Sequence, residues 1–526
     1  MIRDLGVDVS NLPRSAAYCV VGGGIAGLLL ATKLARGRNS VIVLESGGLD
    51  FEADIHDLNI VDDPLSRYSR ELTGRYRGLG GSSSRWGGRM IPISPHDQGR
   101  REYLSLPAWP VELETLDRYE HELEDLFRIG HDSFDDIEKT RPGVSGILAS
   151  DTQDLLARWA KCPSFARCNL VNTLGEELRS NPYVTVILHA TVTDFQVDRE
   201  KRRLRSLTAK SLGGNVITVS ADEFALAAGA IESTRLLLLL DAGCDHKAFA
   251  GTDALGMHFQ DHLKAEVAVV DRQRARLTNH LLGYRFISGA RRDLHLELSP
   301  DAQAEEGVGS GFVYVSMDIA DSGLGMIKSV AQSLQRGRVE VPQLRSALGN
   351  FGLLSTAAYW RLRFGQLYVP PEIDFRMMVC VEQLPDRNNR ISLSQKTDRF
   401  GMRKARIEWT PREADERTFQ STINHLARYW QRSGYGELCP LIWNKSVTSG
   451  APIIERAEAC AHPSGTTRMG TDPSTSVVSP DLRCHAIPNL AVASSSTFPT
   501  AGSANPTLTI MKLALRLADH YMGSNG

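Results

Sequence analysis

YCVVGGGIAGLLLATKLARGRNSVIVLE, residues 18–45, is the stretch that decides the fold of this chain. The apolar run Tyr18–Val21 predicts a buried parallel strand, and Leu28–Arg36 predicts an apolar helix after it. Val41–Leu44 then predicts a second buried strand. Strand, glycine-rich turn, helix and strand in this order predict one βαβ unit, and therefore an α/β domain of the Rossmann-like kind.

Three glycines and one carboxylate inside this unit predict a dinucleotide site. Gly22 permits a tight turn, Gly24 lets the backbone approach a pyrophosphate, and Gly27 lets helix and strand pack closely. The helix N-terminus offers free N–H groups and the positive end of its dipole to the phosphates. Glu45 ends the second strand, where its carboxylate can accept hydrogen bonds from both ribose hydroxyls. This fingerprint leaves FAD and NAD open as alternatives.

The composition excludes several classes of protein. A length of 526 residues predicts two or three domains, and 42% hydrophobic with 23% charged residues describes a globular chain. The net charge of −2 gives no basic footprint for a nucleic acid. The longest apolar runs, near residues 236–240, are too short for a membrane span, and the first residues lack an export signal.

Eight scattered cysteines, with no C-x-x-C pair, predict reduced thiols and a cytoplasmic location. Neither these cysteines nor the histidines show the spacing of a metal site, so the sequence predicts no metal.

A second glycine-rich segment covers residues 74–97, GRYRGLGGSSSRWGGRMIPISPHD. Its glycines predict a loop without a helix, whose backbone lies flat against a large planar ligand. Apolar residues around Trp86 and Ile91 argue against a disordered linker.

The rest of the chain divides by its periodicity. Residues 98–180 predict mostly charged helices, and 184–197 predict strands. Strands are predicted at 216–220 and 224–227, and with a helix at 234–241 they form a second strand–glycine–helix passage that brings another N-terminus to the phosphates.

Residues 265–455 predict an antiparallel sheet, with strands at 265–271, 311–318, 375–382, 390–394 and 405–409. An amphipathic helical insert, 325–369, is a lid, a partner-binding surface, a membrane-surface helix or a solvated excursion. Further predictions are a helix at 414–433, a strand at 489–493, and a last helix at Thr507–Tyr521 that follows Asn505-Pro506.

Over almost its whole length the chain resembles the glucose–methanol–choline (GMC) family of flavin oxidoreductases. The carriers are GGGIAG with Glu45, GLGGSSSRWGG at 78–88, AAGAIEST at 227–234, LGMHFQDH at 255–262, HPSGTTRMG at 462–470 and TFPTAGSANPTLT at 497–509. The resemblance implies a Rossmann-like FAD-binding domain from residues 1–97, 184–264 and 456–526. It also implies a substrate domain, residues 98–183 and 265–455, built on an antiparallel sheet flanked by helices.

The resemblance also assigns the cofactor contacts. Relatives carry a flavin-linking histidine where this chain has Arg85, so FAD is expected to bind without a covalent bond. Ala493-Ser494-Ser495 stands where many relatives have Asp or Gly, so the usual carboxylate contact near the phosphates is not expected. The implied FAD-binding residues are Gly22, Gly24, Gly27, Glu45, Ser46, Gly80, Gly81, Ser82, Arg85, Trp86, Gly87, Gly88, Val192, Ala228, Gly229, Ser494, Asn505, Pro506 and Thr507.

The implied activity is oxidation of an alcohol to a carbonyl, by proton abstraction and hydride transfer to flavin N5. GGSSSRWGG and SANPTLT are most similar to bacterial and pyranose-oxidase-like members, which implies a carbohydrate-like small molecule; the electron acceptor is oxygen, a quinone or a redox protein. His462 matches the family's catalytic base and Asn505 its partner. The alternative roles are a structural loop histidine for His462 and a helix cap for Asn505.

Three other histidines, His258, His262 and His485, receive no catalytic role. Two other functions stay open as alternatives: a non-redox FAD-containing lyase on the same scaffold, and an NAD-linked enzyme or nucleotide-binding module. The second glycine-rich loop, 78–88, argues against NAD, because a nicotinamide enzyme has no need of a second flat platform.

Overall fold

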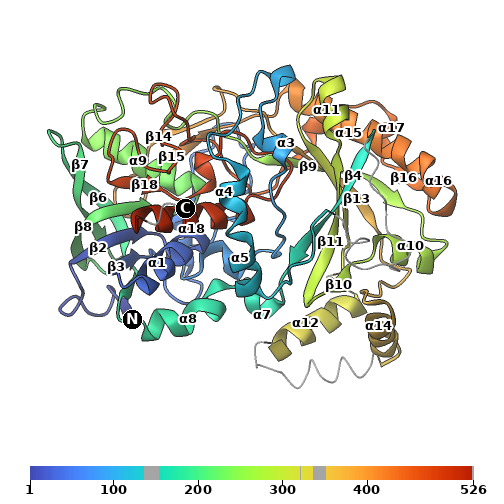
Figure 1. Ribbon diagram of the computed structural model, residues 1–526, viewed down its shortest axis with the longest axis horizontal. Coiled ribbons are helices and arrows are strands. Elements are labelled where there is room, and N and C mark those ends of the chain that lie inside the picture. Colours follow the sequence, from blue (N-terminus) through green and yellow to red (C-terminus); the bar gives the residue numbers. More distant parts are fainter. Residues whose placement is uncertain (136–152, 320–321, 336–350, 524–526) are drawn as a thin grey trace.

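A computed structural model describes residues 1–135, 153–319, 322–335 and 351–523, and these form two large sheets side by side (Figure 1) and one small sheet. The first sheet has the strand order β1-β5-β3-β2-β8-β7-β6, and β18 pairs with β8. Strand β2 pairs in parallel with β3 and β8, whereas β7 pairs antiparallel with β6 and β8. The strands are β1 Ile2–Asp4, β2 Ser15–Val21, β3 Val41–Leu44, β5 Val184–Leu188, β6 Thr191–Asp198, β7 Arg203–Lys210, β8 Val216–Leu226 and β18 Leu490–Val492.

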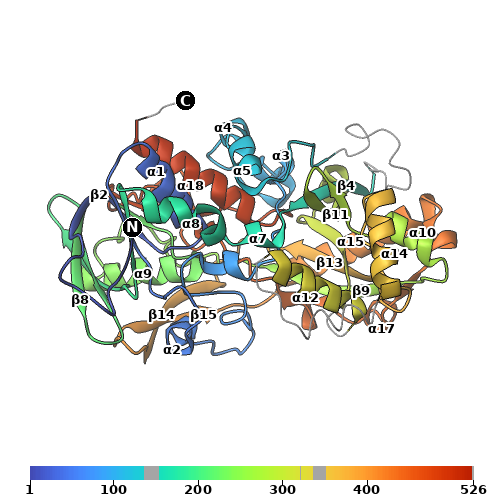
Figure 2. The same ribbon diagram turned by 90° about the horizontal axis from the view of Figure 1, so that it is seen from below.

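The predicted βαβ unit is confirmed. Helix α1 covers Ile25–Arg36 and begins three residues earlier than the sequence predicted. Helix α18 covers Thr507–Tyr521, as predicted, and lies beside α1 (Figures 1 and 2). Helix α9 covers Ala230–Gly243 and begins at once after Gly229, which takes a φ of +77° that ends the extended chain. The predicted start at residue 234 was therefore four residues late, while the predicted strands 216–220 and 224–227 are confirmed as parts of one continuous strand, β8.

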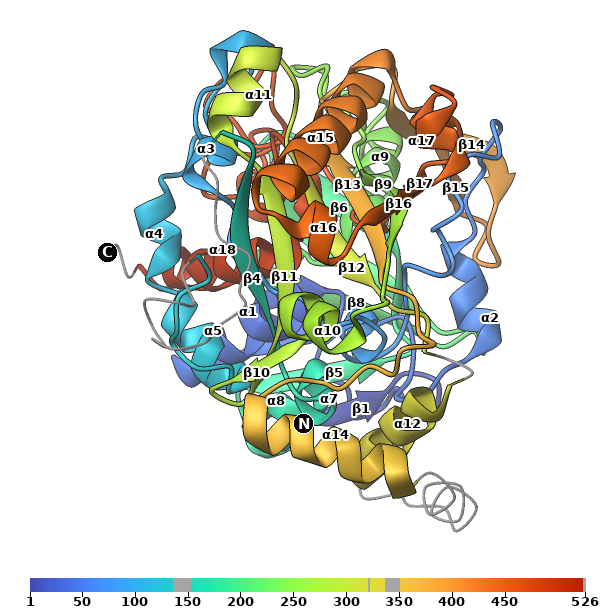
Figure 3. The same cartoon turned by 90° about the vertical axis from the view of Figure 1, so that its right-hand side faces the viewer.

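The second sheet, called here the cap sheet, has the order β10-β11-β12-β13-β9-β16, with β4 on β11 and β17 on β9. Within the described residues its strands pair antiparallel, as predicted. Helix α15, Glu413–Arg432, packs across β12 and β13 (Figure 3). The strands are β4 Leu155–Cys162, β9 His262–Val270, β10 Arg285–Ile287, β11 Ala290–Leu298, β12 Gly311–Ser316, β13 Arg376–Glu382, β16 Leu441–Trp443 and β17 Glu458–Ala459.

Two predictions about the sheets were wrong. Strand β4 lies in the segment predicted as mostly helical; its charged residues Arg158 and Lys161 are buried because they pair with Glu297 and Glu124. Strands β14, Arg390–Thr397, and β15, Arg403–Glu408, do not join the cap sheet. They form their own two-stranded sheet against α9 (Figures 1 and 2).

Most of the glycine-rich segment 74–97 is loop, but Gly81–Ser84 forms a 3₁₀ turn and Pro95–Gln98 forms helix α3, so the expectation of no helix was wrong there. Other helices are α2 Ala53–His56, α4 Leu113–Asp117, α5 Glu120–Phe127, α7 Phe165–Cys168, α8 Leu170–Ser180, α10 Ala275–Leu282, α11 Pro300–Glu306, α16 Tyr435–Leu438 and α17 Lys445–Thr448.

The insert predicted at 325–369 contains helices α12, Gly323–Gln335, and α14, Phe351–Phe364, while residues 336–350 lie outside the described part. Both helices lie at one end of the cap sheet (Figures 1 and 3). Leu362 and Phe351 are exposed on α14. The role of the insert stays a prediction. No helix within the described ranges is long and apolar enough to cross a membrane.

The predicted domain boundaries also stay a prediction. The strands of the first sheet fall within residues 1–97, 184–264 and 456–526. The cap sheet draws on 98–183 and 265–455, together with the start of β9 and with β17.

Candidate active site

One pocket gathers the predicted dinucleotide motifs, and His462 lines it as well. Its walls come from the turns after β2, β3 and β8 and from the start of α18. The predicted cofactor residues that line it are Gly22, Gly24, Glu45, Ser46, Gly81, Ser82, Val192, Ala228, Gly229, Ser494, Pro506 and Thr507.

The turn after β2 needs its glycines for the reasons that the sequence suggested. Gly22 has a φ of +108°, and a Cβ atom added there would lie 2.6 Å from the carbonyl oxygen of Ala227. A Cβ atom at Gly27 would lie 2.0 Å from the carbonyl oxygen of Gly22. The tight turn and the close approach of α1 to β2 are thus confirmed.

Three helices present their N-termini to this pocket. The N-cap residues of α1, α9 and α18 are Gly24, Gly229 and Pro506. None of these three residues accepts a hydrogen bond from the first turn through its side chain. Their first N–H groups and positive dipole ends suit a pyrophosphate. At Gly24 an added Cβ atom would meet nothing closer than Gly81 Cα, at 4.0 Å, so the backbone is open to a ligand. These residues fit a bound FAD.

The Glu45 carboxylate joins three parts of the pocket wall. Its Oε2 accepts a hydrogen bond from the N–H of Gly23 at 2.7 Å, and its Oε1 accepts from the N–H groups of Gly47 at 3.0 Å and Gly78 at 3.1 Å. Burial raises the pKa of Glu45, although these hydrogen bonds act to lower it. One acceptor position on Oε2 is left for a ribose hydroxyl. The sequence did not indicate the bracing role.

Three arginines, Arg70, Arg75 and Arg77, and Glu232 line the same pocket and were missed in the sequence. Arg77 pairs with Glu232 at 3.0 Å and donates to Ser46 Oγ at 3.2 Å; Arg75 lies 3.8 Å from Glu232. Burial opposes ionisation of Glu232, but Arg77, Arg235 and Arg75 together lower its pKa to about 2. No motif spacing joins these residues, so only the fold reveals them.

Several predicted cofactor residues do not line the pocket: Gly27, Gly80, Arg85, Trp86, Gly87, Gly88 and Asn505. Arg85 is exposed and its guanidinium lies over the rings of Tyr76, at 4.7 Å, and Phe51, at 5.0 Å. Trp86 donates its indole N–H to the carbonyl of Cys168 at 2.8 Å. Gly87 is exposed. A cofactor role for these residues stays a prediction.

His462 stands in a chain of hydrogen bonds with two other residues. His262 Nε2 lies 2.7 Å from the carbonyl oxygen of Gly502 and must donate to it, so His262 Nδ1 is an acceptor. His462 Nδ1, 2.9 Å away, therefore carries the proton and donates to His262. The remaining nitrogen, His462 Nε2, keeps its lone pair and lies 3.4 Å from the Asn505 amide nitrogen. Burial, followed by His262 and Arg89, lowers the pKa of His462 well below its ordinary value, which favours this neutral form.

Asn505 faces His462 and does not cap α18. The N-cap of that helix is Pro506, without a side-chain hydrogen bond, so the alternative role as a cap was wrong. The Oδ1 atom of Asn505 is buried without a hydrogen-bond partner. A buried acceptor of this kind is costly unless something donates to it. A donor group of a bound ligand, other than the hydroxyl that faces His462 Nε2, would do so.

A buried carboxylate fixes the loop that carries His462. Asp261 Oδ1 accepts from the backbone N–H groups of His462 at 2.9 Å and Cys460 at 3.1 Å, and Tyr68 donates its hydroxyl to Oδ2 at 3.0 Å. Burial raises the pKa of Asp261 to about 7 despite these bonds.

A buried ion cluster holds the loop before Asn505. Glu382 accepts from the N–H of Gly502 at 2.9 Å, and Asp97 accepts from the N–H of Ser503 at 2.9 Å. Arg101 pairs with both carboxylates, and all three side chains are buried. Residues from two distant segments thus fix the position of Asn505.

Two of the other histidines named in the sequence, His258 and His485, take no part in this geometry. His258, whose pKa burial lowers to about 4, and His485, which contacts Ser476 at 3.0 Å, do not line the pocket. His262, also left out of catalysis by the sequence, contacts His462 directly.

Comparisons with known proteins agree with this arrangement. The family profile described as GMC oxidoreductase matches residues 385–514. Paromamine 6'-oxidase of Streptomyces fradiae is 32% identical over 153 residues, which span 29% of this chain but only 26% of that relative. The 6'''-hydroxyparomomycin C oxidase of Streptomyces lividus is 24% identical over 97% of this chain and 92% of its own length.

Solved structures share the fold. A structure of formate oxidase from Aspergillus oryzae superposes with a TM-score of 0.57 at 15% identity and covers 97% of this chain and 99% of its own. Motifs, pocket and comparisons thus agree: residues 385–514 match the family described as GMC oxidoreductase, and over 97% of its length the chain is similar to an oxidase.

Proposed function

We propose that this protein oxidises an alcohol group of a sugar, glycoside or cyclitol to a carbonyl. The observation that carries the proposal is that the Asn505 amide nitrogen lies 3.4 Å from His462 Nε2, and His462 lines the pocket that gathers the dinucleotide motifs. The two relatives that oxidise paromamine and 6'''-hydroxyparomomycin C support a carbohydrate-like substrate.

His462 is the general base of this proposal. Its Nε2 lone pair accepts the proton of the substrate hydroxyl, while Nδ1–H remains bonded to His262. The lowered pKa keeps the imidazole neutral near pH 7, which is the form that can take a proton. Asn505 turns its unpaired Oδ1 and its amide N–H groups towards the substrate and orients the carbinol C–H. When bound, FAD supplies the two-electron acceptor for the carbinol hydride.

The cofactor is held without a covalent bond in this proposal. Arg85, which replaces the flavin-linking histidine of relatives, points to Tyr76 and Phe51 at the surface. The acceptor of the second half-reaction is oxygen, a quinone or a redox protein. A cytoplasmic location is part of the proposal and is supported by eight cysteines without a disulfide.

Anaerobic mixing of the FAD-loaded protein with sugars, glycosides and cyclitols tests the function. Bleaching of the oxidised flavin by one class, with formation of the matching carbonyl compound, is the expected result. A flavin that stays oxidised with every alcohol tried would contradict the proposal. The lyase alternative receives no support from the relatives described and is not proposed.

A further inference from the structure

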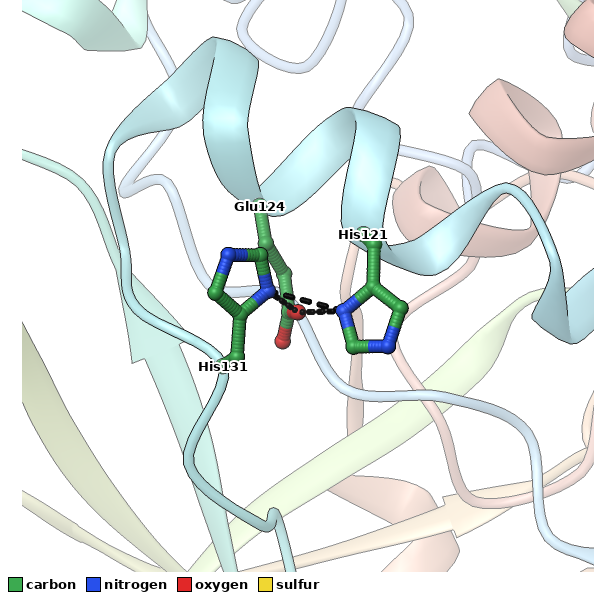
Figure 4. A group of neighbouring side chains, drawn as sticks. All are labelled: His121, Glu124 and His131. Atoms are coloured by element: carbon green, nitrogen blue, oxygen red, sulfur yellow. Dashed lines mark hydrogen bonds and ion pairs between the residues drawn. The ribbon is translucent and has the colours of Figure 1, made fainter.

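Three side chains of α5 and the loop after it converge (Figure 4), and none of them lines the pocket. His121 and Glu124 lie one turn apart on α5, and His131 follows in the loop after that helix. Figure 4 shows both imidazoles turned towards the same carboxylate. Among the described residues, this is the one group of three histidine, cysteine or acidic side chains close enough to share a metal ion.

The contacts form a closed triangle of three atoms. Glu124 Oε2 lies 3.1 Å from His121 Nδ1 and 2.8 Å from His131 Nδ1, and the two Nδ1 atoms are 2.8 Å apart. If both imidazoles donate to the carboxylate, two N–H groups face each other. If one imidazole donates to the other, the accepting nitrogen presents its lone pair to the carboxylate oxygen. No placement of protons makes all three contacts hydrogen bonds, whereas a central cation would make all three atoms ligands.

The surroundings of the triangle hold its members in place. Asp125 Oδ1 lies 3.0 Å from His131 Nε2 and accepts its N–H, which leaves Nδ1 free as a ligand. The other carboxylate oxygen of Glu124 pairs with the buried amine of Lys161, which also donates to the carbonyl of Gly130 at 3.1 Å. A carboxylate on the far nitrogen of a ligating histidine is the usual support of a metal site.

We propose that His121, Glu124 and His131 bind a divalent transition-metal ion, for which zinc is the best match. Two imidazoles and one carboxylate are a zinc ligand set that leaves a fourth position for water. Zinc–ligand bonds of about 2.0–2.2 Å place tetrahedral ligands roughly 3.3 Å apart, so the triangle has to open by a few tenths of an ångström.

The charges and the exposure of the group also allow a cation. The two negative charges of Glu124 and Asp125 exceed the one positive charge of Lys161, so the ion enters a site of net negative charge. The side chains of His121 and His131 are 73% and 49% exposed, so water can complete the coordination.

The ion has a structural role in this proposal. It joins α5 to the loop that leads towards β4, and none of its ligands lines the cofactor pocket. The sequence predicted no metal for two reasons. The three-residue spacing of His121 and Glu124 is common on charged helices, and the third ligand, His131, comes from the following loop.

Zinc titration of the untagged, FAD-loaded protein after treatment with a chelator tests the site. We expect one zinc ion per chain, and we expect His121→Ala and His131→Ala each to weaken binding by about 100-fold. Cobalt in place of zinc should add the visible bands of a four-coordinate ion. His246→Ala is the matched control, because His246 is an exposed histidine that contacts only one carboxylate, Asp241, at 3.3 Å.

Equal zinc affinity in the wild type and in the His121→Ala/His131→Ala double variant would overturn the proposal, as would the absence of binding to the wild type. Flavin absorbance confirms that each variant is folded. If the alanine variants do not fold, Asp125→Asn, which touches no proposed ligand atom, should weaken zinc binding by about 10-fold, and unchanged affinity would count against the site.

Discussion

The two sides of the pocket are built in different ways. The cofactor side consists of short turns whose glycines and N–H groups come from motifs close together in the sequence, and Glu45 braces them by accepting three backbone N–H groups. The loops that carry His462 and Asn505 are instead held by buried side chains from distant segments, among them Asp261 and Glu382. The first side specifies a backbone shape, and the second specifies the position of two reacting groups.

The largest effect is expected at the reacting group itself. His462→Ala should slow anaerobic reduction of the flavin by about 10²–10⁴-fold, the usual contribution of a positioned base. FAD should remain bound, because the braces of the cofactor side are untouched. His485→Ala, a half-buried histidine outside the pocket, is the control and should react normally. A His462→Ala protein reduced at the wild-type rate would remove the base from the mechanism.

A change on the cofactor side should instead weaken the binding of FAD, while His462 and Asn505 stay unchanged. Glu45→Gln keeps the size of the side chain but removes the charge from three hydrogen bonds, each worth about 1.5–3 kcal/mol when charged. FAD should bind about 10- to 100-fold more weakly, measured by fluorescence during dialysis. Glu52→Gln is the control: Glu52 accepts the N–H of Gly48 at 3.2 Å without lining the pocket. Equal affinity in both variants would show that Glu45 is not a brace.

His262 tests the support of the reacting groups alone, because it contacts His462 without lining the pocket. His262→Leu removes the acceptor for His462 Nδ1–H and should slow flavin reduction by about 10-fold, the equivalent of one hydrogen bond. The acid limb of the pH–rate profile, expected below pH 6.5 in the wild type because burial lowers the pKa of His462, should move as well.

His262→Gln is the matched rescue of that change. Its amide can donate to the carbonyl of Gly502 and accept from His462, so it should recover most of the rate. A pH–rate profile that is the same in all three proteins would reduce His262 to a packing residue.

The smallest effect concerns stability and Asp261. Its carboxyl group has a pKa of about 7 in the folded protein and about 3.9 when unfolded, so in the folded state it stays protonated to a higher pH. The folded state binds more protons between these values, and the stability that this group contributes is lost as pH rises from about 4 to about 7. The Tm of the wild type should therefore fall over this range relative to Asp261→Asn. A difference in Tm that does not change with pH would contradict the raised pKa.

Sequence reasoning succeeded where one backbone geometry admits one residue type. Gly22 and Gly27 could be assigned because a side chain would collide with the backbone of Ala227 in the first case and of Gly22 in the second, and the extent of α18 followed from its Asn505-Pro506 start. The role of His462 came from a resemblance and agrees with its position in the pocket.

The support of the catalytic loops could not be predicted. Asp97 and Glu382 are separated by most of the chain, and each resembles any other acidic residue until the fold places it against Arg101. Strand β4 was missed for the same reason, since the charges of Arg158 and Lys161 are compatible with burial only through partners elsewhere in the sequence.

The late position of several pocket elements affects the order of events during synthesis. His462, β18 and α18 all follow residue 455, yet β18 pairs with β8 and the start of α18 closes the pocket. A chain still emerging from the ribosome can form the early βαβ unit, but it lacks one of the three helix ends that face the phosphates. Tight capture of the flavin therefore has to wait until α18 has been synthesised, and a nascent chain stalled before β18 should depend on chaperones to protect the exposed edge of β8.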